Sequence, residues 1–280
     1  MKLIMLGTGN AAVTKCYNTC FLLKDEERPE GDRCFLVDGG GGNGLFSQLE
    51  AAGVDWHEIH SIFVTHRHMD HIMGIIWMMR MILTGIKNGS YTGTAVIYGH
   101  NKVIRILNKE AELLLSKKDR SFIGKRLILA DVEDGETREI IGRRVTFFDM
   151  QSEKTKQFGF SMNIGAPAAG TQNARCFLTC CGDEPCSESA RPYAAHSRWL
   201  LHEAFCLYSD ADRFKPYEKK HSTVKDTCTL AEDLQIPNLV LYHTEDTNLA
   251  NRRELYTREG RQFYSGNLYV PDDLETIELI

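Results

Sequence analysis

The segment at residues 65–71 constrains the fold and the chemistry of this chain more than any other. It reads Thr-His-Arg-His-Met-Asp-His, and it places four candidate metal ligands, His66, His68, Asp70 and His71, within six residues. Neutral imidazole and ionised carboxylate are good ligands for divalent transition metals. The alternative is a polar loop that is rich in histidine by chance, and four ligands at this spacing argue against it. The segment therefore predicts a metal site.

The apolar residues on either side predict how these ligands are presented. Residues 62–64 predict a strand that ends at the motif, and the apolar segment 72–83 predicts a helix that leaves it. His66 and His68 point to the same side of an extended chain, because side chains alternate along a strand. The other two ligands fall where the chain turns, so they can approach a second metal from another side.

Five apolar runs along the chain end in a polar residue of the kind that binds metals or takes part in catalysis. These residues are Asp38, His66, Asp183, His202 and His243. Strands that all stop in such residues converge on one edge of the core and form an open site at the rim of a layered α/β domain. Asp183 follows a glycine that lets the backbone come close, so it is the candidate for a bridging carboxylate, with an ordinary turn residue as the alternative. His243 is the candidate distant imidazole, and the alternative is a strand-end histidine without a metal.

The composition is that of an ordinary soluble globular protein. Of the 280 residues, 42% are apolar and 25% are charged, and we expect a single domain over residues 1–280. The net charge of −5 argues against a broad nucleic-acid-binding surface. The longest apolar segment, residues 72–86, is interrupted by Gly74 and Arg80, so we expect no membrane span and no membrane partner. The nine cysteines, an odd number, favour reduced thiols and a cytoplasmic location.

Hydrophobic periodicity predicts strands that alternate with helices. The expected strands include residues 2–6, 61–64, 94–98, 176–180 and 239–242, with residues 19–23 and 34–37 forming a hairpin. The expected helices cover residues 72–83, 101–116, 193–201 and 223–234.

The motif at residues 65–71 resembles the signature of the metallo-β-lactamase fold, which is Thr-His-x-His-x-Asp-His after an apolar strand. Further motifs at residues 5–9, 201–204, 221–223 and 242–243 resemble ribonuclease Z and related phosphodiesterases. The resemblance spans roughly residues 3–245. It implies an α/β protein with the αββα sandwich of the metallo-β-lactamase fold, a homodimer, and the activity of a metal-dependent hydrolase.

The same resemblance implies a role for each candidate residue. The metal ligands would be His66 and His68 for the first ion, Asp70, His71 and His243 for the second ion, and Asp183 as the bridge. The cofactor would be one or two divalent ions, zinc or alternatively manganese. A metal-bound hydroxide, oriented by Asp70, would attack a phosphodiester. His221 would protonate the leaving oxygen, and His202 and Glu203 would hold His221 or the ligands in place.

One departure from the family pattern concerns the first ion. The family carries a further histidine shortly before a Gly-Tyr pair as the third ligand of this ion, whereas the matching residues 148–160 contain no histidine. Asp149, Gln151, Glu153 or a water molecule are the candidate substitutes. We therefore expect a weak or empty first site and a more firmly held ion in the other half.

A second departure concerns the substrate. Ribonuclease Z carries a long arm that grips tRNA between the third histidine and the bridging aspartate, but residues 151–183 leave room for no more than a short loop at 165–170. A small phosphodiester, such as a cyclic nucleotide or a phosphoribosyl compound, therefore fits better than an RNA 3′ end. The alternatives are a hydrolase of another ester, such as a lactone or thioester, and a degenerate, non-catalytic binding protein.

Overall fold

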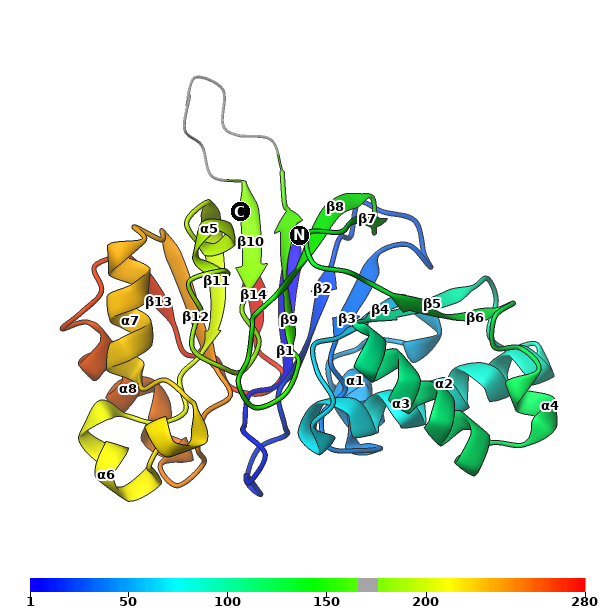
Figure 1. Cartoon of the computed structure of the whole chain (residues 1–280), viewed down its shortest axis with the longest axis horizontal. Coiled ribbons are helices and arrows are strands. Elements are labelled where there is room, and N and C mark those ends of the chain that lie inside the picture. The colour runs from blue at the N-terminus through cyan, green and yellow to red at the C-terminus, as the bar shows by residue number, and fades with distance from the viewer. Residues whose placement is uncertain (166–175, 280) are drawn as a thin grey trace.

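Two sheets packed face to face form the centre of the protein, and helices cover the outer face of each sheet (Figure 1). The computed structural model describes residues 1–165 and 176–279. Each sheet has seven strands, in the orders β14-β1-β2-β3-β4-β5-β6 and β13-β12-β11-β10-β9-β8-β7. This architecture confirms the predicted αββα sandwich.

The strands of the first sheet are β1 Lys2–Gly7, β2 Cys20–Lys24, β3 Cys34–Val37, β4 Ile59–Val64, β5 Ala95–Gly99, β6 Leu127–Asp131 and β14 Thr276–Glu278. Those of the second sheet are β7 Thr137–Ile140, β8 Arg143–Asp149, β9 Phe158–Asn163, β10 Phe177–Cys180, β11 Ser197–Glu203, β12 Asn238–Tyr242 and β13 Asn267–Tyr269. The helices are α1 Gly44–Ala51, α2 Met69–Asn88, α3 Asn101–Leu114, α4 Lys117–Arg120, α5 Arg191–Ala194, α6 Ala211–Phe214, α7 Val224–Asp233 and α8 Arg252–Gly260. The predicted hairpin is confirmed, because β2 and β3 pair antiparallel.

Several strands are buried on both faces, and this burial explains why their sequences are continuously apolar. Along β1, Leu3 and Met5 join the core between the two sheets, while Ile4 and Leu6 join the core beneath α1 and α2. Alternation along the strand therefore sends apolar side chains into two different cores. Aromatic rings fill the space between the sheets, where Phe63 lies 4.9 Å from Phe147, measured between ring centroids.

The prediction of a helix over residues 193–201 is wrong. Only α5 is helical there, and the chain then enters β11, which pairs in parallel with β10 and β12. The apolar run from Trp199 to Leu201 is fully enclosed between two neighbouring strands and two cores. A short apolar run of this kind has the same hydrophobic pattern in a buried strand as in a buried helix.

Helix α2 begins at Met69, three residues earlier than predicted, with His68 as its N-cap. With 20 residues, this helix is long and apolar enough to cross a membrane by length and composition alone. However, 61% of its most apolar 18-residue stretch is buried inside the protein. The buried face packs against the first sheet, where Ile75, Met78 and Ile82 join the core.

A close backbone contact fixes the start of α2 against the turn after β3. The Gly74 N–H donates to the Gly40 carbonyl at 3.0 Å, and the Gly39 N–H donates to the His71 carbonyl at 2.8 Å. A Cβ atom at Gly74 would lie 1.8 Å from the Gly39 carbonyl oxygen. Only glycine therefore allows the helix to come this close to the turn.

Gly74→Ala should force α2 away from this turn, because the new methyl group would meet a backbone carbonyl that has no free direction to move. We expect the free energy of unfolding in urea to fall by about 3 kcal/mol, the upper range for overpacking. Gly42→Ala in the same turn is the matched control, because a Cβ there meets nothing within 4 Å. Equal stabilities of the two variants would show that the close contact imposes no constraint.

Candidate metal centre

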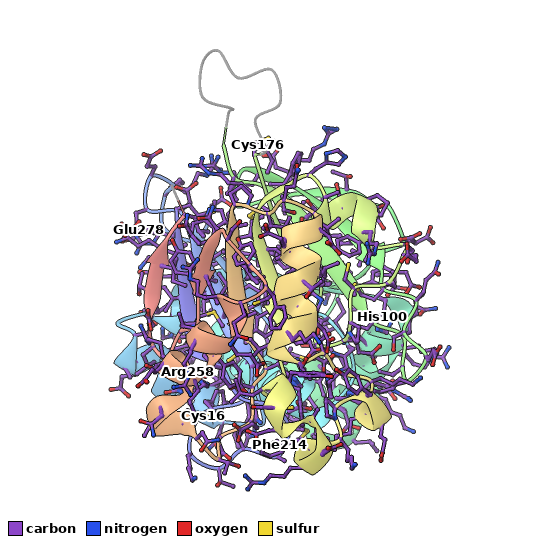
Figure 2. All side chains as sticks on the ribbon, turned by 90° about the vertical axis from the view of Figure 1, so that its left-hand side faces the viewer. Cys16, His100, Cys176, Phe214, Arg258 and Glu278 are labelled. Atoms are coloured by element: carbon purple, nitrogen blue, oxygen red, sulfur yellow. The ribbon has the colours of Figure 1, made fainter. Side chains whose placement is uncertain are left out.

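The predicted metal ligands come together where strands of both sheets end. β4 delivers His66 from the first sheet, and the first turn of α2 carries Asp70 and His71. From the second sheet, Asp183 follows β10 and His243 follows β12. Figure 2 shows Cys16 and Phe214, the last residue of α6, at one end of the molecule and Cys176, which leads into β10, at the opposite end.

Asp183 lies at the centre of the cluster. Its Oδ2 is 3.6 Å from His66 Nε2, 3.5 Å from His71 Nε2 and 3.5 Å from His243 Nε2. His68 lies beside His66, with 2.8 Å between His68 Nδ1 and His66 Nε2. One carboxylate oxygen thus faces imidazoles from both predicted halves of the site, which is the position that a bridging ligand requires.

Asp70, His71 and His243 form the second half of the site. Asp70 Oδ2 lies 3.3 Å from His71 Nε2 and 3.4 Å from His243 Nε2. Their donor atoms all lie within 4.8 Å of one another, and all three residues are buried. Three converging oxygen and nitrogen donors of this kind match the ligand preferences of zinc and neighbouring transition metals.

Asp38 holds His71 in place, whereas sequence reasoning placed it with the ligands at one edge of the core but gave it no role in the site. His71 Nδ1 donates to Asp38 Oδ2 at 2.7 Å, while His71 Nε2 is buried without a hydrogen-bond partner and faces the cluster. A carboxylate on the far nitrogen of an imidazole is the usual support of a metal-binding histidine. The one available signal was its position at the end of β3, which it shares with the ligands.

Thr65 extends the same support to His66. Thr65 Oγ1 donates to Asp38 Oδ2 at 2.8 Å, so this hydroxyl can only accept from His66 Nδ1, which lies 3.0 Å away. A proton on Nδ1 leaves the lone pair of His66 Nε2 directed at Asp183 and available to a metal.

Two site residues have left-handed backbone conformations. Asp38 has φ of 58° and His243 has φ of 57°. Residues other than glycine adopt this region at a cost of order 1 kcal/mol or more, and such strain clusters at functional sites. Here it ends β3 and β12 and redirects each side chain towards the cluster.

The electrostatics of the cluster favour a bound cation. Burial raises the pKa of Asp70 and of Asp183, but the neighbouring imidazoles outweigh burial and hold both pKa values well below the usual range. Burial lowers the pKa of His71, whereas Asp70 and Asp38 raise it well above its usual value overall. The same anionic carboxylates that favour a proton on His71 would also attract a divalent cation to this cluster.

The proposed protein substitutes for the third histidine of the first half are wrong. Asp149 accepts the N–H of Gln151 at 2.8 Å, Gln151 is exposed, and Glu153 pairs with Lys220 at 2.7 Å. None of the three belongs to a group of converging metal donors among the described residues. The buried amide of Gln157 approaches instead, 3.1 Å from His66 Nδ1, and its Nε2 donates to Asp183 Oδ1.

Gln157 therefore supports the centre from behind. Its side-chain N–H donates to Asp183 Oδ1, which leaves Oδ2 as the oxygen next to the histidines. Its sequence signal was weak, because a single glutamine before an apolar strand is common on protein surfaces. Among the described residues, His66, His71 and Asp183 form the buried donor group of the first half, and His68 lies beside this group through its contact with His66. The weaker metal binding expected of this half stays a prediction.

His221 and Glu203 lie on the second-sheet side of the cluster. His221 Nδ1 is 3.8 Å from Glu203 Oε2, and the imidazole stacks on Phe205 with 4.8 Å between the ring centroids. Glu203 is fully buried and accepts the N–H groups of Phe205 and Ser222. It thus joins the segment after β11 to the segment that carries His221.

His202 supports the loop of the bridging carboxylate. Its Nδ1 donates to the Glu203 carbonyl at 2.8 Å, and its Nε2 accepts the Cys186 N–H at 3.2 Å. The first bond fixes the ring against its own strand, and the second fastens the loop after Asp183 to β11. They also require a neutral ring, and burial lowers the pKa of His202 to about 4.

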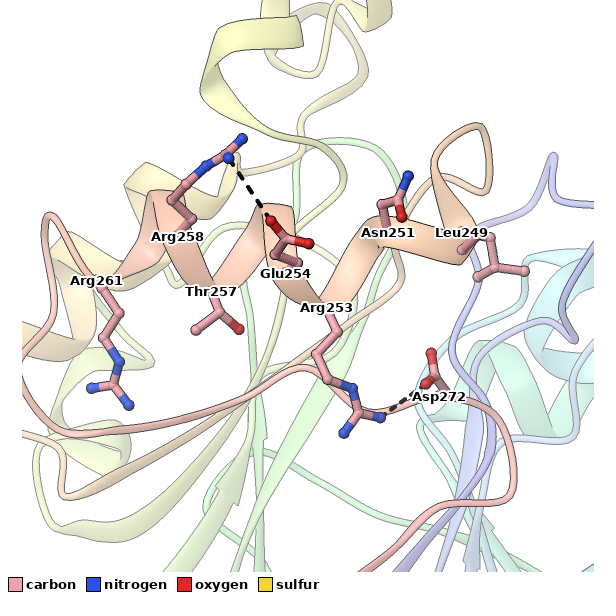
Figure 3. Close-up of a pocket in the computed structure, with 9 residues that line it drawn as sticks. Leu249, Asn251, Arg253, Glu254, Thr257, Arg258, Arg261 and Asp272 are labelled. Atoms are coloured by element: carbon pink, nitrogen blue, oxygen red, sulfur yellow. Dashed lines mark hydrogen bonds and ion pairs between the residues drawn. The ribbon is translucent and has the colours of Figure 1, made fainter.

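A cavity of about 730 Å³ opens onto the cluster. Ligands from both halves line it, together with His221 and the side chains of Lys154, Lys219 and Lys220. A second hollow of about 680 Å³ runs along α8 (Figure 3). Its Arg253 pairs with Asp272, its Arg258 pairs with Glu254, and no histidine lines it, so it lacks the chemistry of the first cavity.

His202→Gln should reduce the acid sensitivity of the protein. Because the folded pKa lies below the unfolded value, the unfolded state binds the extra proton, and stability is lost as the pH falls from 6.5 towards 4. We expect the loss between pH 7 and pH 5 to shrink by about 2 kcal/mol in urea unfolding. His196→Gln, at an exposed position, is the control and should keep the full dependence.

Asp38→Asn should weaken metal binding without removing a ligand, because His71 loses its anionic partner. We expect zinc affinity in calorimetry to fall by about 10- to 100-fold. Asp25→Asn is the control, because Asp25 is also a buried aspartate of the first sheet but pairs with Arg143. Unchanged affinity in the Asp38 variant would contradict its role.

Comparison with known proteins identifies the family of this chain. Residues 1–263 match the family described as anti-Pycsar protein Apyc1. A ribonuclease Z of Pyrobaculum neutrophilum is 26% identical over 298 residues, covering 99% of this chain and 98% of that protein.

Solved structures agree on the fold. The metallo-β-lactamase fold protein YhfI of Bacillus subtilis superposes with a TM-score of 0.73 at 16% identity, over 99% of this chain and 98% of that one. The short form of human tRNase Z superposes with a TM-score of 0.69 at 21% identity, over the whole of both chains. The chain is therefore a metal-dependent hydrolase of the metallo-β-lactamase fold, similar to ribonuclease Z, and it belongs to the family of the anti-Pycsar protein Apyc1.

Proposed function

We propose that this protein is a phosphodiesterase that acts on a small phosphodiester, such as a cyclic nucleotide, rather than on an RNA 3′ end. The observation that carries the proposal is the cavity itself. It places two groups of metal ligands, joined by Asp183, beside three lysines that suit an anionic substrate. Its volume of about 730 Å³ falls in the range of pockets for small ligands.

The relatives named ribonuclease Z support a phosphodiester as the substrate class. The argument against RNA is the short segment between β9 and β10 together with the net charge of −5. Of the expected short loop at 165–170, residues 166–170 lie outside the described residues.

Zinc is the proposed metal, because imidazole nitrogens form most of the donor set, with manganese as the alternative. When bound, the metal supplies Lewis acidity and a water of lowered pKa. The protein places the anionic Asp70 between His71 and His243, where its free lone pairs can accept a hydrogen bond from the attacking water. His66, His71 and Asp183 are held in turn by Thr65, Asp38 and Gln157, so the donors need little rearrangement.

In this proposal His221 serves the leaving group, and its imidazole ring is neutral. Burial, and then the neighbouring His243, lower the pKa of His221 to about 3, so the ring carries no stored proton at neutral pH. Neutral imidazole still donates from one nitrogen and accepts at the other. Protonation of the leaving oxygen therefore requires a proton that reaches the ring during the reaction. Burial raises the pKa of Glu203 well above its usual value, so this carboxyl, 3.8 Å from His221 Nδ1, can itself hold a proton next to the ring.

The nine free cysteines support a reducing compartment, which agrees with the cytoplasmic location that we propose. The homodimer expected from the family resemblance stays a prediction.

Removal of the metal by a chelator should abolish hydrolysis of bis-p-nitrophenyl phosphate, and added zinc or manganese should restore it. His71→Ala and Asp183→Asn should each lower kcat by at least about 100-fold, since each removes a ligand of the centre. Glu232→Gln, at the end of α7, is the control because its carboxylate accepts hydrogen bonds from Ser265 and, among the described residues, from no ligand of the centre.

The same preparation tests the substrate class. A cyclic nucleotide should be cleaved faster than an RNA with a 3′ trailer, a lactone or a thioester. A metal-loaded protein that cleaves only the lactone or thioester would overturn the proposal in favour of another ester. One that cleaves none of these substrates would favour a degenerate binding protein.

A further inference from the structure

The loop at residues 150–157 occupies the place in the chain where the family carries the third histidine, and it is firmly held against the metal centre. Ser152 Oγ donates to Glu184 Oε1 at 2.8 Å, directly beside the bridging aspartate. At the other end, Arg67 Nε donates to Thr155 Oγ1 at 3.0 Å. The loop is thus fastened to both chain segments that supply ligands of the first half.

Lys154 is the residue that this loop presents to the cavity. Its Nζ lies 3.5 Å from His221 Nε2 and 3.9 Å from Glu184 Oε1, and its side chain is 26% exposed. His68, on the side of the first half, lines the same cavity as Lys154 and His221. The ammonium is therefore placed in the cavity that both histidines line.

The other two lysines of the cavity have partners closer than the nearest carboxylate of Lys154 or an aromatic ring beneath them. Lys220 pairs with Glu153 at 2.7 Å, and its side chain is 53% exposed. Lys219 lies over the Phe205 ring, with 4.8 Å between Nζ and the ring centroid. Lys154 has its nearest carboxylate at 3.9 Å among the described residues, so its ammonium keeps donors free for an incoming anion.

We propose that Lys154 is a catalytic residue that binds a non-bridging oxygen of the substrate phosphate, on the side of the centre that lacks the third histidine. The proposal rests on the proposed phosphodiesterase function. An ammonium donates charge-assisted hydrogen bonds to phosphate, and these strengthen as negative charge builds up on the oxygens in the transition state. A fixed positive charge would thereby add to the charge that the metal ligands bring to this side of the centre.

Lys156 provides a matched control two residues along the same loop. Its Nζ lies over the Phe158 ring, with 5.0 Å to the ring centroid, and it does not line the cavity. Lys154→Met and Lys156→Met remove the same charge from the same loop and retain a long apolar side chain. Lys154→Arg restores the charge and the hydrogen-bond donors.

The test uses the full chain loaded with zinc, with metal equivalents measured for every variant. Lys154→Met should lower kcat/KM for bis-p-nitrophenyl phosphate by about 100-fold, the effect of losing one preorganised donor. Its inhibition constant for inorganic phosphate should rise by at least about 10-fold, since a charge-assisted hydrogen bond is lost. Lys154→Arg should recover part of both losses, and Lys156→Met should match the unaltered protein.

Two results would overturn the role of Lys154. One is a Lys154→Met variant that keeps both the catalytic efficiency and the phosphate inhibition of the unaltered protein. The other is a loss of activity that follows a loss of bound zinc in the same variant, which would make the lysine structural. If the unaltered protein cleaves no phosphodiester, the proposed function fails by itself. Calorimetry with inorganic phosphate then still decides the binding role, because only Lys154→Met should lose the binding heat.

Discussion

The rest of the site depends on the hydrogen bonds that the buried Asp38 carboxylate accepts. It accepts hydrogen bonds from the Thr65 backbone, the Thr65 hydroxyl and His71 Nδ1, so one buried group joins the end of β3, the end of β4 and the start of α2. The contact is possible because Gly74 lets α2 touch the turn after Asp38. A buried carboxylate without these partners would be costly, so the fold and the orientation of the metal ligands stabilise each other.

The two halves of the centre differ in how they are built. The half with Asp70, His71 and His243 has three buried protein ligands, and two of them come from a single helix turn. The half with His66 and His68 has the bridging Asp183 and then the loop of Lys154 where a third imidazole is expected. This loop supplies a cation in place of a metal ligand, which is consistent with a site that handles an anionic substrate through two kinds of positive charge.

The family resemblance and the strand-end pattern were sufficient to predict the αββα architecture and to name the residues that converge. His66, Asp183 and His243 each follow a strongly apolar run, and the carboxyl ends of parallel strands meet at one edge. The same reasoning failed for the segment that contains Trp199, because burial on both faces removes the periodicity that distinguishes a strand from a helix. It also failed at Asp149 and Glu153, because the direction of a loop side chain depends on contacts that no local pattern encodes.

The sequence by itself determined the ligand types, their spacing along β4 and α2, and hence a centre suited to a divalent transition metal. Only the tertiary structure decided which groups support those ligands. Asp38, Gln157 and Lys154 act through contacts with residues 33, 26 and 67 positions away in the chain. Each is an ordinary residue in its local sequence, and its role follows from long-range packing of two sheets and one helix. For this reason the chemistry of the centre is visible in a short motif, whereas its orientation and its charge balance depend on the complete fold.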